Sequence, residues 1–500
     1  MAKPSEKSFF GHPAGLSTLF FTEMWERFSF YGIRPLLVLF MSAAILDGGF
    51  GFDRRTASAI VGIYGFSVYL ASLPGGWIAD RWLGLRRSIW WGGVLIAIGH
   101  LCIALSSVFA KPAFFLGLVF IVMGTGLLKP NISASVGDLY PEGGARRDAG
   151  YSIYYMGINL GAFAAPLITG ALGERVGWHF GFGAAGVGML LGLITFRLRA
   201  ASTLGSIGLA PSASPEEQRR VRLITFVGVG VIFLTVILAS VGTLAVNPVS
   251  LAERMSVIVA SMALLYFAYL FFFAGLTSKE KKGVAVIVVL FVFATIFWAA
   301  FEQAPTSLNL FARDFTDRVV FGWEMPTTWL QAANSFFVVT LAPVFAWLWV
   351  SLAKRNLELS SPAKFSFGLV LTGLGFQVMV IAANQVIGGG GNGVRVSMLW
   401  LVFSYFLQTL GELSISPVGL SSMTKLAPPR FVGQMMGVWF MASAIGNLIA
   451  GLVGGHVNPE NLQEMPQLFQ RTAFSLFIAA AVLGLMVVPI RRMMGERGSN

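Results

Sequence analysis

Long apolar runs separated by short polar stretches dominate this sequence. A helix that crosses a bilayer needs roughly 20 consecutive, mainly apolar residues. Runs of this kind predict 14 membrane-spanning helices, near 16–46, 56–80, 87–110, 112–137, 149–173, 178–198, 223–246, 254–276, 284–312, 327–353, 366–387, 395–424, 430–454 and 468–490. The pattern therefore predicts an all-helical integral membrane protein.

The predicted spans form two sets of six with an additional pair between them. Residues 1–198 hold the first six spans, residues 199–282 a polar linker and the additional hairpin, and residues 283–500 the last six. Lys and Arg gather in the loops of one side, which marks the cytoplasmic side of a membrane protein. Examples are Arg81, Arg86, Arg87, Arg146, Arg147, Lys279, Lys281, Lys282, Arg491 and Arg492. We therefore expect both chain ends in the cytoplasm.

The composition agrees with lipid as the main solvent. Of the 500 residues, 56% are hydrophobic and 12% charged, whereas a soluble chain has about 25% charged residues. The net charge of +12 could indicate a nucleic-acid-binding protein. However, the Lys and Arg residues form short tracts between apolar runs and no continuous basic face, so no nucleic acid partner is expected. One cysteine, Cys102, provides neither a disulfide framework nor a cysteine-based metal site.

Seven charged residues interrupt the apolar runs. They are Glu23, Glu26, Arg27, Arg34, Lys129, Glu302 and Glu412. With about 100° per helical residue, the four in the first span share one stripe with Tyr31. Each such charge costs several kcal/mol at mid-membrane, so buried ion pairs between helices are one explanation. We favour a polar pathway, because the charges come from both halves of the chain and one carboxylate remains in excess to carry a proton.

Helix breakers lie beside three of these charges. Pro130 follows Lys129 directly, Pro305 follows Glu302 by three residues, and Pro417 follows Glu412 by five. Proline frees a backbone carbonyl and kinks a helix, which suits gating around a central cavity. His100, in the middle of the third span, is expected to be a hydrogen-bonded packing residue and not a proton relay.

Several motifs follow one another in a recognisable order. Residues 23–32 read EMWERFSFYG, residues 75–81 read GGWIADR, and further motifs lie at 129–131, 155–161, 297–303 and 411–419. They resemble the motifs of the proton-coupled oligopeptide transporters, a branch of the major facilitator superfamily, over nearly the whole chain. The resemblance implies the major facilitator fold, two six-helix bundles, with the additional hairpin that bacterial members carry. It also implies a proton-coupled symporter that imports di- and tripeptides by alternating access.

The resemblance implies a role for each candidate residue. The proton-coupling residues would be Glu23, Glu26, Arg27 and Glu302, with Glu302 opposite Arg34. The peptide carboxylate would meet Arg34 and Lys129, and its amino terminus Glu412. The peptide backbone would bind Asn159 and Asn334. The side-chain pockets would be lined by Tyr31, Tyr69, Trp298, Trp439 and Ser443. An outer gate would be formed by Arg54 with Asp314.

The chemistry of a short peptide agrees with this assignment. A peptide is a zwitterion, so a pocket with cations at one end and a carboxylate at the other orients it. One residue departs from the family pattern: Phe30 precedes Tyr31 where the family has two tyrosines, so one hydroxyl is missing.

Other functions remain as alternatives. A carrier of nitrate or another small anion would use the cations and make Glu412 dispensable, and a receptor would sense peptide without moving it. An intramembrane enzyme is not expected, because no Ser/His or metal-ligand cluster lies in the spans. We expect a monomer in the bacterial inner membrane, with protons as coupling ions and no cofactor.

Overall fold

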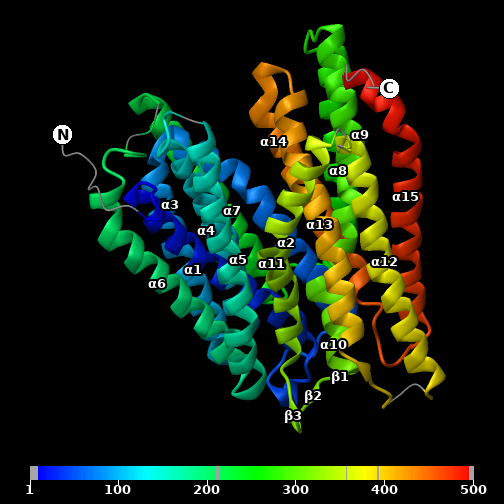
Figure 1. Ribbon diagram of the computed structural model, residues 1–500. Coiled ribbons are helices and arrows are strands. Elements are labelled where there is room, and N and C mark those ends of the chain that lie inside the picture. The colour runs from blue at the N-terminus through cyan, green and yellow to red at the C-terminus, as the bar shows by residue number, and fades with distance from the viewer. Residues whose placement is uncertain are drawn as a thin grey trace. The chain divides into compact units, whose positions relative to one another are not determined.

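The computed structural model describes residues 9–494 except residues 143, 210, 212, 356, 358 and 391–392. Residues 1–8 and 495–500, the chain ends that the topology prediction places in the cytoplasm, lie outside this part. Within it, 14 long helices follow one another (Figure 1). They are α1 (Ala14–Ser42), α2 (Arg54–Ile78), α3 (Leu85–Ala104), α4 (Ser106–Asp138), α5 (Gly144–Arg175), α6 (Trp178–Thr203), α7 (Pro215–Ser240), α8 (Pro248–Phe272), α9 (Ser278–Phe301), α11 (Ala332–Lys354), α12 (Ser361–Gly388), α13 (Leu399–Leu426), α14 (Val432–Gly454) and α15 (Glu464–Met494). The prediction of an all-helical fold is confirmed.

Twelve of the described helices are long and apolar enough to cross a membrane. The other two long helices, α1 and α13, contain most of the charges predicted to lie inside the membrane: Glu23, Glu26, Arg27, Arg34 and Glu412. Charged residues lower the mean hydropathy of a helix, yet α1 is buried along most of its length. The two helices that hold much of the candidate site are therefore also the least lipid-like of the long helices.

The chain divides into two compact units, which we call the first and the second unit. The first contains the chain up to Phe52 and Ser67–Val246, and the second contains Asp53–Phe66 and the chain from Asn247 onward. The start of α2 thus belongs with α8–α15, and the two hairpin helices α7 and α8 belong to different units. The predicted boundaries after residues 198 and 282 stay a prediction.

In the first unit, α1 packs against α5 and α6, and α3 packs against α4 and α6. The backbones of α3 and α4 approach closely where glycines face each other. A Cβ atom at Gly99 would lie only 2.6 Å from the carbonyl oxygen of Gly117. Small residues at such crossings let membrane helices pack tightly without a hydrophobic driving force between them.

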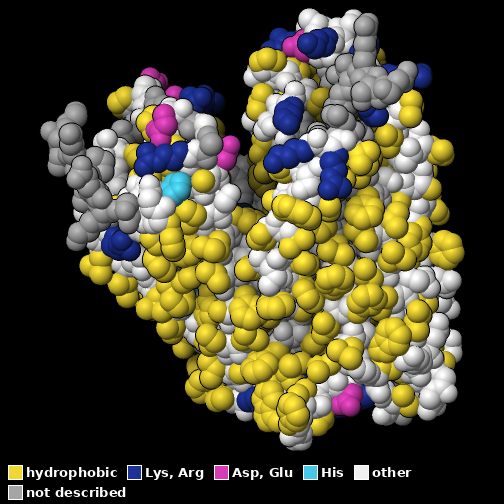
Figure 2. Space-filling model, viewed as in Figure 1, with side chains coloured by type: hydrophobic (Ala, Val, Ile, Leu, Met, Phe, Trp, Pro, Cys, Tyr) yellow, Lys and Arg dark blue, Asp and Glu magenta, His cyan; other side chains and the backbone are white. Residues whose placement is uncertain are grey.

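In the second unit, α12 packs against α13 and α15, and α9 packs against α14 and α15. The start of α2 joins this unit through another glycine contact: a Cβ atom at Gly62 would lie 2.8 Å from the Cα atom of Gly451. Apolar side chains cover wide areas of the faces that Figure 2 shows. On α15, the exposed stripe includes Phe474, Ile478 and Leu485, as expected where a helix contacts lipid.

Among the described residues, two π-helical turns, three short 3-10 helices and the non-helical residue Ala110 inside α4 depart from α-helical geometry. A π-helical turn covers Ala79–Leu83 after α2, and another covers Ala304–Leu308 before the short α10 (Asn309–Asp314). The latter contains Pro305, so one of the three predicted breakers coincides with a change of helix type. Pro130 and Pro417 instead lie inside the continuing helices α4 and α13, since neighbouring groups in a membrane bundle can satisfy the freed backbone carbonyl.

Four two-residue strands lie in the loops of the second unit. β1 (Thr316–Asp317) pairs in parallel with β4 (Val396–Ser397). β2 (Val319–Val320) and β3 (Trp323–Glu324) form an antiparallel hairpin. Its two-residue turn has positive φ angles at Phe321 (50°) and Gly322 (80°), which matches the twist of a tight hairpin.

Candidate functional site

A charged cluster lies on α1 inside the first unit. Glu23, Glu26 and Arg27 are 1%, 0% and 2% exposed. Arg27 Nε lies 3.2 Å from Glu23 Oε1, a contact that the four-residue spacing favours on a helix, and Arg27 also forms an ion pair with Glu26. From α4, the Thr125 hydroxyl donates to Glu26 Oε1 at 3.3 Å. Two carboxylates thus share one guanidinium away from water, so the cluster depends on being complete.

Phe30 lies between two guanidinium groups on the same stripe of α1. Its ring centroid is 5.1 Å from Arg27 Cζ and 5.7 Å from Arg34 Cζ, within the range of cation–π attraction. The ring itself is buried and makes an edge contact with Tyr31. The missing hydroxyl therefore leaves an aromatic face that both cations use.

Lys129 on α4 lies close to the cluster on α1. Its Nζ is 4.7 Å from the ring centroid of Tyr69 on α2, and it interacts electrostatically with Glu23. Asn159 on α5 is 7% exposed and donates from Nδ2 to the carbonyl of Tyr155 on its own helix at 3.0 Å. The first unit therefore brings the predicted cations Arg34 and Lys129 into the same group of helices as the predicted proton-coupling carboxylates.

Tyr154 on α5 is a residue that the sequence reasoning missed. It is buried, it interacts electrostatically with Glu23, and its hydroxyl lies 3.3 Å from the Ser133 hydroxyl of α4. The signal was the tyrosine pair 154–155, of which only the second residue belonged to the motif considered. His100 also behaves as predicted: it is buried, and its Nε2 lies 2.5 Å from Ser29 Oγ.

Two carboxylates lie inside the second unit. Glu302 caps the end of α9, is 4% exposed and directly precedes the segment with the π-helical turn. Glu412 on α13 accepts a hydrogen bond from Asn334 Nδ2 of α11 at 3.1 Å, and Asn334 also donates to Thr409 at 3.0 Å. Glu302 and Glu412 are close enough to repel each other electrostatically. A cationic group between them would relieve this repulsion.

Apolar and hydroxyl side chains accompany these carboxylates. Trp298 lies one turn before Glu302 on α9, and its buried Nε1 finds no hydrogen-bond partner in the part of the chain that the structure describes. Trp439 and Ser443 lie four residues apart on α14 and are both buried. The second unit thus collects the predicted residues Trp298, Glu302, Asn334, Glu412, Trp439 and Ser443.

The predicted outer gate pair is also formed within the second unit. Arg54 Nη1 lies 2.5 Å from Asp314 Oδ2 and donates to the carbonyl of Val457 at 2.8 Å. Arg313 adds a 2.9 Å contact to the other oxygen of Asp314. The predicted approach of Glu302 to Arg34 joins residues of different units and stays a prediction, as do the roles of all site residues.

Among the described residues, no group of three or more His, Cys, Asp or Glu side chains could hold a metal ion. Within each unit, the ion pairs described above instead join acidic side chains to basic ones.

Known proteins resemble this chain in sequence and in fold. A family model described as the POT family matches residues 86–468. The chain is 52% identical to the "Peptide transporter YePEPT" of Yersinia enterocolitica subsp. palearctica, over 99% of this chain and 97% of that protein. It is 38% identical to a "Di-/tripeptide transporter" of Lactococcus lactis subsp. lactis, over 98% of each chain.

Solved structures agree with these sequence relatives. A crystal structure of a peptide transporter POT in complex with sulfate has a TM-score of 0.88 and 40% identity, covering 98% of this chain and 97% of that one. A POT family transporter in complex with 5-aminolevulinic acid has a TM-score of 0.87 and 34% identity, covering 97% and 98%. These relatives are transporters and not enzymes, and the chain belongs to the POT family, the proton-coupled oligopeptide transporters that its motifs resemble.

Proposed function

We propose that this protein is a proton-driven symporter that imports di- and tripeptides by alternating access. One observation carries the proposal: the charges inside the helices are sorted by unit. Among the seven charges singled out in the sequence, Arg27, Arg34 and Lys129 outnumber two carboxylates in the first unit, whereas both of those in the second unit, Glu302 and Glu412, are carboxylates. A zwitterion offers a carboxylate to the first set and an ammonium group to the second. The names of the relatives support the same substrate class.

Within the proposal, each pole has its own residues. Arg34 and Lys129 bind the peptide carboxylate, and Glu412, oriented by Asn334, binds the ammonium group. Asn159 and Asn334 hydrogen-bond the peptide backbone, and the aromatic side chains line its side-chain pockets. The related structure with 5-aminolevulinic acid supports this arrangement, because that ligand carries an amino group and a carboxylate.

The proton supplies the driving force in this proposal. A proton gradient provides about 1.4 kcal/mol per pH unit, and the membrane potential about 2.3 kcal/mol per 100 mV for each charge. Protonation of Glu302 frees Arg34 for the peptide, and deprotonation toward the cytoplasm re-forms the pair and expels the peptide. The cluster of Glu23, Glu26 and Arg27 takes part in the same coupling.

We infer the membrane location and the orientation of the protein from its family and from its basic residues. The chain is a multi-pass membrane transporter, and we place it in the bacterial inner membrane with both ends in the cytoplasm, as the distribution of Lys and Arg indicates. It works as a monomer, with protons as coupling ions and no bound cofactor.

Uptake by proteoliposomes tests the proposed function. Labelled dialanine should accumulate inside vesicles only when an inward proton gradient is imposed, since the gradient is the only energy source present. The control is the same vesicle with a protonophore, in which the internal concentration of dialanine should not rise above the external one. Uptake of nitrate that dialanine does not inhibit would instead identify an anion carrier. Binding of peptide without any uptake would identify a receptor.

The Arg54–Asp314 pair provides a test of the gate. Arg54→Gln should lower dialanine uptake about fivefold, because a partly buried ion pair of this kind contributes roughly 1 kcal/mol to the closed state of the proposed gate. The exchanged pair Arg54→Asp with Asp314→Arg should restore part of the rate. Arg55→Gln is the matched control, since Arg55 is more exposed and its ion pair with Glu464 is 3.6 Å long. An unchanged rate in Arg54→Gln would remove the gating role.

A further inference from the structure

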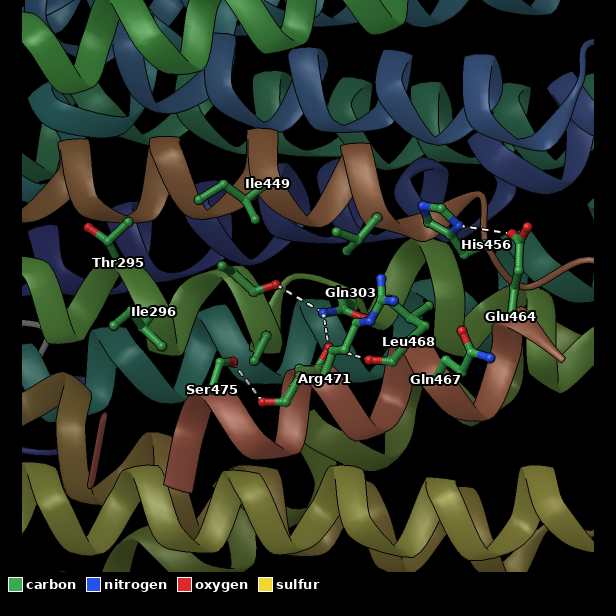
Figure 3. Close-up of a pocket in the computed structure, with 14 residues that line it drawn as sticks. Thr295, Ile296, Gln303, Ile449, His456, Glu464, Gln467, Leu468, Arg471 and Ser475 are labelled. Carbon is green, nitrogen blue, oxygen red and sulfur yellow. Dashed lines mark hydrogen bonds and ion pairs between the residues drawn. The ribbon is translucent and has the colours of Figure 1, made fainter. Parts of the chain in front are cut away.

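A cavity of about 530 Å³ lies within the second unit between α9, α14 and α15 (Figure 3). None of the predicted proton, peptide or gate residues lines it. Along α15 it extends from Glu464 to Ser475, a length of about 16 Å at 1.5 Å per residue. The cavity is therefore an elongated groove that runs with the helices, separate from the site described above.

The two ends of this groove differ in chemistry. Near the start of α15 its walls carry His456, Glu464 and Gln467, and farther along they carry Ile296 and Ile449. Glu464 is already engaged: it lies 3.0 Å from His456 Nδ1, 3.6 Å from Arg55 and 2.7 Å from Asn461. The carboxylate at the polar end thus has its own partners.

Arg471 is the cation within the groove. Figure 3 shows its side chain extending from α15 across the cavity toward Gln303. No hydrogen bond or ion pair joins Arg471 to another residue within the described part of the chain. A guanidinium inside a membrane helix requires an anion or water, so its counter-charge is expected from outside the protein.

The groove faces the lipid side of α15. Gln467, Arg471 and Ser475 lie four residues apart on one stripe, and all three are exposed. The neighbouring stripe contains the exposed apolar residues Phe474, Ile478 and Leu485. Arg471 lies seven residues from the start of α15, about 10 Å along the axis. A long arginine side chain can bridge that depth to the headgroup region.

We propose that this groove binds one membrane phospholipid, with its phosphate on Arg471 and one acyl chain along Ile296 and Ile449. Guanidinium pairs with phosphate through two parallel hydrogen bonds, and a bilayer offers phosphate at this depth. The groove places the cation beside an apolar half. A phospholipid would fill both halves, whereas a soluble anion would leave the apolar half empty. In the proposed topology the lipid comes from the outer leaflet. The inference is independent of the transported substrate.

Retention of lipid by the purified full chain tests this site. Native mass spectrometry in mild detergent with added phosphatidylglycerol should show one tightly held lipid, and Arg471→Gln should retain it roughly tenfold less. Arg492→Gln is the matched control, because it removes the same charge from the exposed far end of α15. Ile449→Trp, which fills the apolar half, should also lose the lipid while Arg471 remains.

Two further ligands, added separately, distinguish a lipid phosphate from free phosphate. Diacylglycerol, which lacks phosphate, should not be retained, and millimolar inorganic phosphate should not raise the melting temperature in an Arg471-dependent way. Retention of phosphatidylglycerol by Arg471→Gln at the unmodified level would overturn the proposal. So would stabilisation through Arg471 by inorganic phosphate with no lipid retained, which would indicate an anion site only.

Discussion

Glu302→Gln is expected to abolish proton-driven accumulation of dialanine while peptide counterflow continues. Glutamine has nearly the shape of a protonated glutamate but cannot release a proton, so the protein would remain in the state that binds and exchanges peptide. With one proton per peptide, an inward gradient of one pH unit supports about tenfold accumulation. In the variant this ratio should fall to about one, measured with labelled dialanine in proteoliposomes.

The location of Glu302 makes this a sharp test. The side chain is buried at the end of α9, directly before the segment with the π-helical turn that contains Pro305. A change of its charge therefore acts at the point where the helix alters its geometry. Glu324→Gln is the control, because Glu324 lies in strand β3, outside the long helices, and pairs with Arg318 at 2.9 Å. Accumulation by Glu302→Gln at the normal level would contradict the coupling scheme.

The helices were predictable because lipid imposes a simple rule. A span must be long, apolar and internally hydrogen-bonded, so apolar runs mark it regardless of its neighbours. The ends depend on local chemistry that hydropathy does not report. The predicted run 284–312 starts as a helix already at Ser278, because Thr277 and Glu280 form a reciprocal cap with the backbone.

The candidate site was predictable in its charges and less so in its partners. A charge inside an apolar run is visible in the sequence because its cost demands an explanation. Tyr154 has no such cost, since a tyrosine is common in membrane helices, and only the folded structure brings it to Glu23. Arg471 is not among the seven charges singled out in the sequence, because nothing there shows that a groove lies beside it.

The division into units depends on contacts that no pattern along the chain reveals. The first 14 residues assigned to the second unit, Asp53–Phe66, belong mainly to the same continuous helix as the following residues of the first unit. What joins them to the second unit is the close approach of Gly62 to Gly451 of α14, and the ion pair of Arg54 with Asp314 of α10. The sequence does not show which other helix a glycine of a membrane helix will contact, so such a crossing is visible only in the folded structure.

Glu412→Gln is expected to reduce dialanine uptake at low substrate concentration by roughly 30-fold or more. The variant removes the carboxylate that would pair with the peptide ammonium group, and an unpaired buried charge costs about 2–5 kcal/mol. Asn334, which donates to Glu412 at 3.1 Å, could still donate to the glutamine oxygen. The folded structure should therefore persist, so the reduced uptake would result from the lost contact with the substrate and not from unfolding.

A modified substrate separates this effect from general damage to the protein. N-acetylated dialanine has no ammonium group, so in the unmodified protein it should compete poorly for the uptake of labelled dialanine. In Glu412→Gln it should compete about as well as unlabelled dialanine does. Glu253→Gln, an exposed carboxylate on α8, should keep the full preference for the free amino group. If Glu412→Gln also kept that preference, Glu412 would not be the acidic pole of the peptide site. The anion-carrier alternative makes the opposite prediction, because it has no use for a carboxylate that faces a substrate ammonium group.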